Sequence, residues 1–375
     1  MRLEFSTYLD AVRFCAAICV VVAHFTFPQF VSGVSYQGAL GGVAVAIFFV
    51  LSGYVIAYTA DHNEKTLSQY AINRLARIYS VAIPALVLTV VVDLYLIRHG
   101  DADRFGIPIY EYNGLWKYLP VFLVFGSDIA GFHAPVLGDG VFWSLSYEVW
   151  YYITFAAYFY LRGLARLLLT GAAVAILGIP ALLYFPSWIL GACIYRAHRN
   201  SRLSVGAATA TAGAVITAAI LIGLGVLGAY DSFDAGMNVA LNNWPRTRLH
   251  NSMNFASHYL VAILTAAHIF FVKFCSLRSL SGDKVRKVIT YMASFTFAIY
   301  LSHRPFMNFW ASANSHEPNA VSSIVLLAFL VVISCWCFGF LSEKQKLRWR
   351  KLFRQIFRAL SGPLGDNAVD SSRSG

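Results

Sequence analysis

The chain has 375 residues, of which 58% are hydrophobic and 13% are charged, and its formal net charge is +11 at pH 7. Soluble domains carry about 25% charged residues, so the composition excludes an ordinary soluble protein and indicates an integral membrane protein. The stretches without Asp, Glu, Lys or Arg are long and continuous, which favours transmembrane helices over short alternating strands. We therefore expect an all-α polytopic membrane protein.

The hydrophobic pattern predicts ten transmembrane segments in chain order, at 7–27, 38–59, 78–97, 144–161, 167–185, 187–196, 204–228, 257–275, 290–310 and 319–341. The first is interpreted as an uncleaved helix rather than a signal peptide, because Arg13 and His24 interrupt it and no convincing small-residue cleavage site follows. The apolar run 115–126 is too short to span a bilayer easily and is expected to be re-entrant or interfacial. A membrane domain is expected over 1–343 and a basic, partly disordered cytoplasmic tail over 344–375.

The distribution of positive charge predicts the orientation. With the N-terminus inside the cell, the inner segments hold 23 of the 29 Lys and Arg residues. The positive-inside rule then places both termini in the cytoplasm. The surplus charge is mostly a topology signal, so the lipid bilayer is an expected partner and nucleic acid is not. The basic tail is expected to rest on anionic lipid as an amphipathic helix.

Cysteine usage gives no sign of a metal or disulfide framework. The six cysteines lie within or at the ends of apolar segments and form no CxxC pair. We expect buried thiols and no metal site.

The first segment carries two ionisable residues on one face. Arg13 and His24 are 11 residues apart, which on a helix is three turns plus roughly 20° of rotation and a rise of about 16 Å. Arg13 is expected near the cytoplasmic face, where Asp10 shares its side of the helix, and His24 near the outer face. Ionisable residues in membrane helices usually face the bundle interior and mark function. The alternative is that Asp10 and Arg13 pair at the interface and His24 bonds a neighbouring helix.

The next two segments add small residues and more arginine. The stretch "GGVAVAIFFVLSGYVIAY" (41–58) contains Gly41, Gly42 and Gly53, which permit close helix packing, and Ser52, a candidate for the substrate path but not for a nucleophile. In "NRLARIYS", Arg74 and Arg77 lie on one face of the helix that enters the membrane. They are either a positive-inside flank or, together with Arg13, a cluster suited to phosphates.

Two later stretches complete the candidates. In "VFWSLSYEVWYY" (141–152), Glu148 lies about a turn inside a membrane helix, where a carboxylate is expected to pair with a cation or a hydroxyl group. Trp143 is either an aromatic-belt residue or a substrate contact. In "SFTFAIYLSHRPF" (294–306), His303 and Arg304 lie at the outer end of the ninth segment, level with His24. His303 contacts the acceptor or is an interfacial histidine bonded to backbone.

Taken in this order, the five elements resemble acyltransferase family 3 over about residues 5–340. Arg13 and His24 match its R-x10-H spacing, "FFVLSGYVI" matches its second-helix signature, and Arg74 and Arg77 match its RxxR element. "WSLSYE" and "SFTFAIYLSHRPF" match two further signatures. Three positions depart from the family pattern: Ala46 stands where an Asp is frequent, Val149 replaces a second acid, and Ser80 replaces a proline.

The resemblance implies a multi-pass enzyme of the inner (cytoplasmic) membrane. It would move an acyl group, expected to be acetyl, from cytoplasmic acyl-CoA to a hydroxyl of a surface or exported glycan. Arg13, Arg74 and Arg77 would hold the coenzyme A phosphates, and His24 would act as general base or through a transient acyl-histidine. Glu148 would position His24 or the acceptor, and the substrate contacts would be Ser52, Trp143 and His303.

Other functions stay open at this point. A secondary transporter would also have about ten helices with buried charge, although no internal repeat is found. A scaffold for polysaccharide export is a third possibility. An acyltransferase could also act on a lipid, peptidoglycan or a small molecule.

Overall fold

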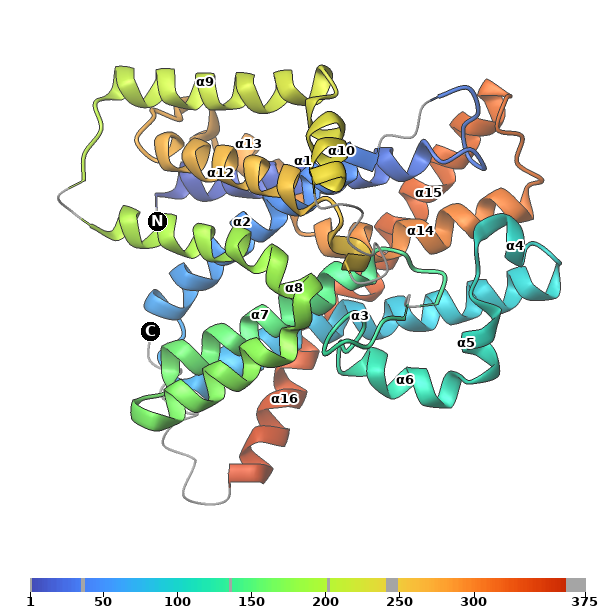
Figure 1. The fold of residues 1–375 in the computed structure, drawn as a ribbon, viewed down its shortest axis with the longest axis horizontal. Helices are drawn as coiled ribbons and strands as arrows, with labels where there is room; N and C mark the ends of the chain where they lie inside the picture. Colours follow the sequence, from blue (N-terminus) through green and yellow to red (C-terminus); the bar gives the residue numbers. More distant parts are fainter. Residues whose placement is uncertain (1, 35–37, 135–136, 201–202, 241–248, 362–375) are drawn as a thin grey trace.

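The computed structural model describes residues 2–34, 38–134, 137–200, 203–240 and 249–361. Its described part is a bundle of helices, and an isolated bridge joins the extended residues Ile129 and Phe132 (Figure 1). Seven segments are long and apolar enough to cross a membrane. They comprise α1 (Leu3–Phe25), α2 (Gly38–His62), α3 (Leu67–Arg98), α8 (Gly163–Arg199), α9 (Ala207–Val226), α12 (Phe255–Val272) and a segment that starts with α15 (Val321–Leu341). The predicted all-α polytopic architecture is confirmed.

Two further long helices are less apolar. They are α7 (Phe142–Tyr160) and α14 (Thr296–Ala313), and polar side chains such as Ser144, His303 and Asn308 are buried in them. The remaining elements are α4 (Ala102–Phe105), α5 (Ile109–Asn113), α6 (Leu115–Leu123), α10 (Ala229–Ala240), η1 (His250–Ser252), η2 (Arg278–Leu280), α13 (Asp283–Ala293), η3 (Glu343–Gln345) and α16 (Lys346–Ser361). The run 115–126 forms the short helix α6 and the turn that follows it, and its re-entrant or interfacial placement stays a prediction. The number of membrane crossings stays a prediction.

The predicted break between segments 167–185 and 187–196 is wrong. Both segments lie in α8, which continues through Pro186 and bends at Gly178, where φ is 73° and ψ is 170°. Glycine adopts this left-handed conformation without steric penalty because it has no Cβ. In Figure 1 the two arms of α8 diverge from this bend. Two other boundaries differ: α3 begins at Leu67, well before 78, and segment 290–310 includes the end of α13 as well as α14.

The second arm of α8 and α2 cross with their backbones in contact. A Cβ added to Gly53 would lie 1.9 Å from the carbonyl oxygen of Trp188, and one added to Gly191 would lie 1.9 Å from that of Val50. Small residues at a helix interface allow this close approach. The packing role predicted for the 41–58 segment is therefore confirmed at Gly53. Gly41 faces α1, where an added Cβ would lie 3.5 Å from Cβ of Ala23.

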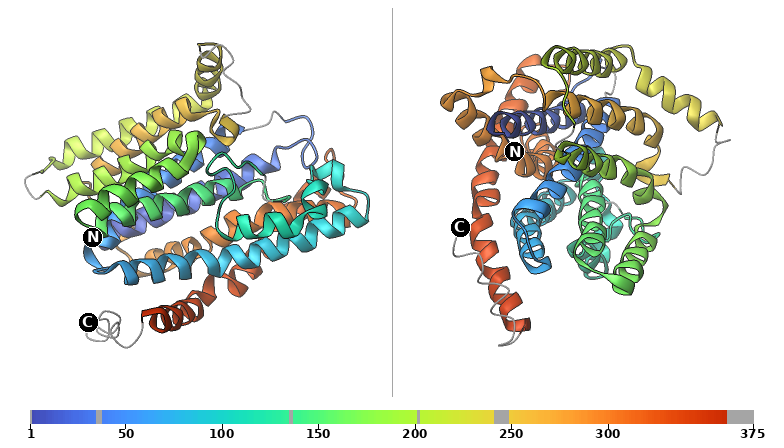
Figure 2. Two further views of the ribbon diagram at one scale, coloured as in Figure 1. Left: turned by 60° about the horizontal axis from the view of Figure 1, so that its bottom comes forward. Right: turned by 90° about the vertical axis from the view of Figure 1, so that its left-hand side faces the viewer.

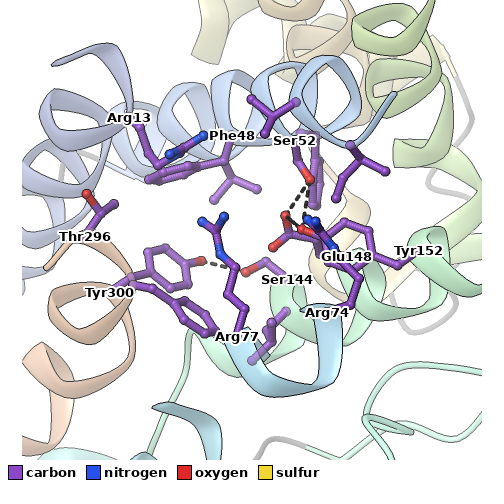
Figure 3. Close-up of a pocket in the computed structure, with 16 residues that line it drawn as sticks. Arg13, Phe48, Ser52, Arg74, Arg77, Ser144, Glu148, Tyr152, Thr296 and Tyr300 are labelled. Atoms are coloured by element: carbon purple, nitrogen blue, oxygen red, sulfur yellow. Dashed lines mark hydrogen bonds between the residues drawn. The ribbon is translucent and has the colours of Figure 1, made fainter. Parts of the chain in front are cut away.

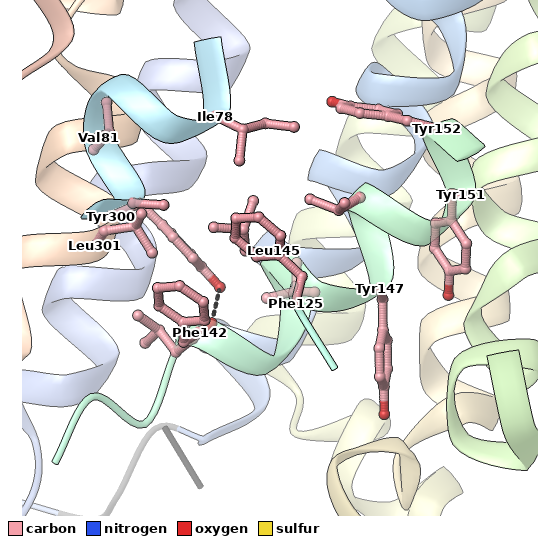
Figure 4. Packing of buried hydrophobic residues seen from close by; sticks show 14 of the residues in the cluster. Ile78, Val81, Phe125, Phe142, Leu145, Tyr147, Tyr151, Tyr152, Tyr300 and Leu301 are labelled. Atoms are coloured by element: carbon pink, nitrogen blue, oxygen red, sulfur yellow. Dashed lines mark hydrogen bonds between the residues drawn. The ribbon is translucent and has the colours of Figure 1, made fainter. Parts of the chain in front are cut away.

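Residues from distant parts of the chain form the central apolar cluster. Figure 4 shows side chains of α3, α7 and α14 packed against one another, among them Ile78, Val81, Phe142, Leu145 and Leu301. Tyr300 belongs to the same cluster and hydrogen-bonds across it. This packing fixes the three helices whose polar side chains form the candidate site.

The two ends of the bundle carry different elements. Figures 1 and 2 place the N-terminus at one end of the long axis and the connection α4–α6 at the other. The basic tail includes α16, which lies against α3, where the rings of Tyr79 and Phe353 are 5.8 Å apart. Residues 362–375 of the predicted tail lie outside the described residues. The contact of α16 with lipid stays a prediction.

Candidate active site

An open cavity lies between α1, α2, α3, α7 and α14 (Figure 3). Five of the predicted site residues line it, namely Arg13, Ser52, Arg74, Arg77 and Glu148. The other lining residues are Val45, Phe48, Phe49, Val55, Ile56, Ser144, Leu145, Tyr152, Thr296, Phe297 and Tyr300. We call it the central pocket.

The three arginines of the central pocket have unequal partners. Arg74 is buried and pairs with the Glu64 carboxylate, so its charge is compensated. Arg13 donates a longer hydrogen bond, 3.3 Å, to Asp10. Arg77 forms no salt bridge with any described carboxylate.

Arg13 and Arg77 lie close enough to interact as like charges. Figure 3 shows their guanidinium groups turned toward one another across the pocket. Like charges repel more strongly where water is scarce, and an anion bound between the two guanidinium groups would offset this electrostatic repulsion. This part of the central pocket can therefore bind a phosphate through paired, charge-assisted hydrogen bonds.

Glu148 stands at the centre of a hydrogen-bond network within the same pocket. Its Oε1 accepts hydrogen bonds from Ser52 Oγ and from Tyr152 OH, each at 2.5 Å. Ser52 Oγ in turn accepts from Trp188 Nε1 at 3.2 Å. A carboxylate that accepts hydrogen bonds from two hydroxyl groups is held in a fixed position.

The expectation that Glu148 positions His24 is not met in this arrangement. Because Glu148 and Tyr152 are four residues apart on α7, they share a helix face, and that face meets Ser52 of α2. Glu148 thus belongs to the central pocket, which the three arginines also line.

His24 belongs to a second polar group, in which it pairs with His303. Nε2 of His303 lies 3.0 Å from Nδ1 of His24, and the ring centroids are 5.0 Å apart. The sequence predicted that the two histidines lie at the same depth, and in the structure their side chains contact one another between α1 and α14. The guanidinium of Arg304 lies 4.9 Å from the ring centroid of Phe27, just beyond α1.

The backbone acceptors allow us to assign the protons of this pair. Nδ1 of His303 lies 3.0 Å from the carbonyl oxygen of Ile299, and Nδ1 of His24 lies 3.0 Å from that of Val20. A carbonyl only accepts, so both Nδ1 atoms carry hydrogen in the neutral rings. The single Nδ1–H of His24 is then shared between two acceptors, the carbonyl oxygen of Val20 and Nε2 of His303. The lone pair of His24 is left on Nε2, as a general base requires.

Tyr300 adjoins both groups. Its hydroxyl lies 2.6 Å from Ser144 Oγ, its side chain lines the central pocket, and its ring centroid is 6.4 Å from that of His303. His24 itself is not among the described residues that line the central pocket. Tyr300 is thus a side chain that lines the central pocket with Arg13 and also lies beside His303, the partner of His24.

The other sequence candidates lie in apolar surroundings. Trp143 packs edge-on against Tyr147, with ring centroids 5.2 Å apart, and is not among the described lining residues of the central pocket. Ala46 is fully buried in a small cluster with Tyr230 and Val261, and Val149 lies in the main core. The helix face on which the family often carries an Asp is therefore apolar in this protein.

Sequence reasoning missed four polar residues of the central pocket: Ser144, Tyr152, Thr296 and Tyr300. Two signals were present. Tyr152 follows Glu148 by four residues, and Tyr300 precedes His303 by three, so each shares a helix face with a residue already singled out.

Comparison with known proteins gives one family and one relative. The family model described as "Acyltransferase domain" matches residues 6–340. "Acyltransferase MdmB" of Streptomyces mycarofaciens is 28% identical over 164 residues, an alignment that covers 40% of this chain and 38% of the relative. No solved structure is significantly similar to the chain.

Proposed function

We infer the reaction of this chain from the family to which it belongs, the acyltransferase family whose model covers residues 6–340. We assign it the transfer of an acyl group, expected to be acetyl, from cytoplasmic acyl-CoA to a hydroxyl of a surface or exported glycan. The observation that carries the donor assignment is the pair of arginines, Arg13 and Arg77, that face one another in the central pocket.

The central pocket has the chemistry that a coenzyme A donor needs. Phosphates carry the negative charge that Arg13 and Arg77 would neutralise, and Arg74, already paired with Glu64, would add hydrogen bonds. Apolar residues such as Val45, Phe48 and Phe49 offer a path for the uncharged arm that ends in the thioester. Ser52 and Glu148 would hold the arm or the acceptor by hydrogen bonds.

In the transfer step, His24 acts as the general base. The acceptor hydroxyl gives its proton to Nε2 of His24 while its oxygen attacks the thioester carbon. The carbon–oxygen bond forms, the carbon–sulfur bond breaks, and the thiolate of coenzyme A leaves and takes up the proton. His303 accepts the hydrogen bond from Nδ1–H of His24 and so fixes the ring with Nε2 available. The rival route, a transient acyl-histidine, uses the same nitrogen as nucleophile.

The expected topology matches this scheme. With both termini in the cytoplasm, as the positive residues predict, Arg13 lies toward the donor side and His24 toward the outer side of an inner (cytoplasmic) membrane. Family membership supports acyl transfer over the alternative of a secondary transporter. A lipid or small-molecule hydroxyl is the alternative acceptor.

The test compares His24→Ala with the matched control His99→Ala in purified protein supplied with labelled acetyl-CoA. His99 also bonds the carbonyl four residues earlier on its helix, Tyr95, but lies at the exposed end of α3. General-base assistance is worth about 10²–10⁴-fold, so His24→Ala should lose that factor in transfer rate while His99→Ala keeps the wild-type rate. Wild-type transfer by His24→Ala would refute the assignment. Label retained on the protein in the absence of acceptor would select the acyl-histidine route.

A further inference from the structure

A second group of titratable side chains lies outside the central pocket, in the loops that precede α7 and α12. One ligand atom from each of Asp128, His133 and His250 lies within 4.8 Å of the other two. We propose that these three residues form a binding site for one divalent transition-metal ion of the zinc class. This site is independent of the acyl-transfer scheme.

The three side chains already face one another without an ion. Oδ1 of Asp128 accepts a hydrogen bond of 2.9 Å from Nδ1 of His133. The rings of His133 and His250 stack with centroids 3.7 Å apart and an angle of 10° between their planes. Two imidazole rings stacked beside a buried carboxylate present their nitrogens and an anionic oxygen to one small volume.

The surroundings of Asp128 resemble the supporting hydrogen bonds of metal sites. Its second oxygen, Oδ2, accepts from Tyr147 OH and, at 3.2 Å, from Nδ2 of Asn251. The backbone carbonyl of Asn251 accepts from Tyr184 OH at 3.1 Å. Partners of this kind orient a ligating carboxylate and tune its strength. They hold Oδ1 toward the histidines.

The donor set selects the class of ion. Two neutral imidazoles and one carboxylate suit Zn²⁺, Co²⁺ or Ni²⁺, whereas Ca²⁺ and Mg²⁺ prefer oxygen ligands alone. Ligand atoms of a tetrahedral zinc site lie about 3.3 Å apart, given zinc–ligand distances of about 2.0 Å. Side-chain rotation must therefore bring the three atoms closer, and His133 must exchange its hydrogen bond to Asp128 for the metal. The His133 side chain is 40% exposed, so an ion and a water ligand can reach the site.

A bound ion would fasten two loops at the start of α7, the helix that carries Glu148. No local sequence pattern pointed to the site, because Asp128 and His250 are separated along the chain by α7, α8, α9 and α10. The folded chain brings them together where the bend of α8 meets both loops: Ala130 donates to the carbonyl of Ile176 at 2.9 Å, and Ser252 donates to that of Pro180 at 2.7 Å.

The test uses the full chain, purified in detergent, freed of any affinity tag and treated with chelator. Co²⁺ is titrated and its visible absorption recorded, and Zn²⁺ is tested for its effect on Tm. We expect one equivalent of Co²⁺ to give a ligand-field band and Zn²⁺ to raise Tm. His133→Ala and His250→Ala should each weaken Co²⁺ binding by at least about tenfold, whereas His99→Ala, an exposed histidine on α3, should leave it unchanged.

His133→Ala is the decisive variant because its half-exposed side chain can be removed with little effect on folding, which its Tm without metal will verify. Absence of the band in the wild-type chain overturns the proposal. So does a band that survives in both His133→Ala and His250→Ala, since the ion would then be bound elsewhere.

Discussion

The crossing of α2 and α8 makes the substitution Gly53→Ala a sharp test of the fold around the central pocket. The new Cβ would lie 1.9 Å from the carbonyl oxygen of Trp188 and 3.1 Å from the backbone nitrogen of Ala192, whereas ordinary contact begins at 3.4 Å. The shortfall is therefore about 1.5 Å. Because the opposing atoms are backbone, rotation of a side chain cannot relieve it, and the helices must separate.

This separation would affect stability and chemistry together. Overpacking costs about 1–3 kcal/mol, and a clash between backbones belongs at the upper end. A helix shift of this size would also stretch the hydrogen bond from Trp188 Nε1 to Ser52 Oγ, now 3.2 Å, beyond hydrogen-bond range. Ser52 would then lose its anchor, and the Glu148 network with it. We expect a lower Tm and a reduced rate of acyl transfer.

Thermal unfolding in detergent and the transfer assay measure both effects, with Gly171→Ala as the matched control. Gly171 lies in the first arm of α8, and a Cβ added there meets nothing within 4 Å. Its replacement should be neutral or stabilising by up to about 1 kcal/mol, since alanine favours helix. If Gly53→Ala and Gly171→Ala have the same Tm and the same activity, the close crossing does not exist in the protein.

Three further predictions concern single charges. Arg77→Ala should weaken binding of coenzyme A, measured by calorimetry, by roughly 10–150-fold, because a charge-assisted hydrogen bond is worth about 1.5–3 kcal/mol; an unchanged Kd would move the phosphate site elsewhere. Glu148→Gln keeps the shape but removes the charged acceptor of Ser52 and Tyr152, so the transfer rate should fall about tenfold or more, and a wild-type rate would show that the network is not used. Burial raises the pKa of Asp139, in the loop before α7, to about 8. Folding therefore favours the protonated form of Asp139. The stability of the folded protein, measured as Tm, should fall as pH rises from about 4 to about 8. Asp139→Asn should flatten this dependence of Tm on pH.

The pattern of apolar segments was readable from sequence because the length needed to cross lipid is a property of one continuous stretch. The same local reasoning marked the run 115–126 as too short to span a bilayer and identified the small residues of α2. It failed at α8. Gly171 and Gly178 are both glycines in an apolar helix, yet only Gly178 adopts positive φ. A Cβ added to Gly178 would lie 3.5 Å from the nitrogen of Ala130, in the loop before α7, whereas one added to Gly171 meets nothing within 4 Å, and no local pattern contains that difference.

For the candidate site too, the sequence identified individual residues, and only the structure showed which of them lie in contact. Arg13, His24, Ser52, Arg74, Arg77, Glu148 and His303 attracted attention because polar and ionisable side chains are costly in membrane helices. The free-energy cost of such a side chain depends on its residue type and on its depth in the membrane, and both can be estimated from the sequence. Which of them meet was decided by helix rotation and crossing: Glu148 turned to Ser52 and Tyr152, and His24 to His303.

By itself, then, the sequence determined that the chain is a helical membrane protein with arginine and histidine at separate depths of its first helix. Only the tertiary structure decided that Arg13 faces Arg77 in one pocket while His24 pairs with His303 in another group, and that Asp128, His133 and His250 converge. The physical reason is the sequence separation over which each interaction acts. Hydrophobic length and residue type act along the chain, whereas the pairing of buried polar groups depends on contacts between helices that are far apart in sequence.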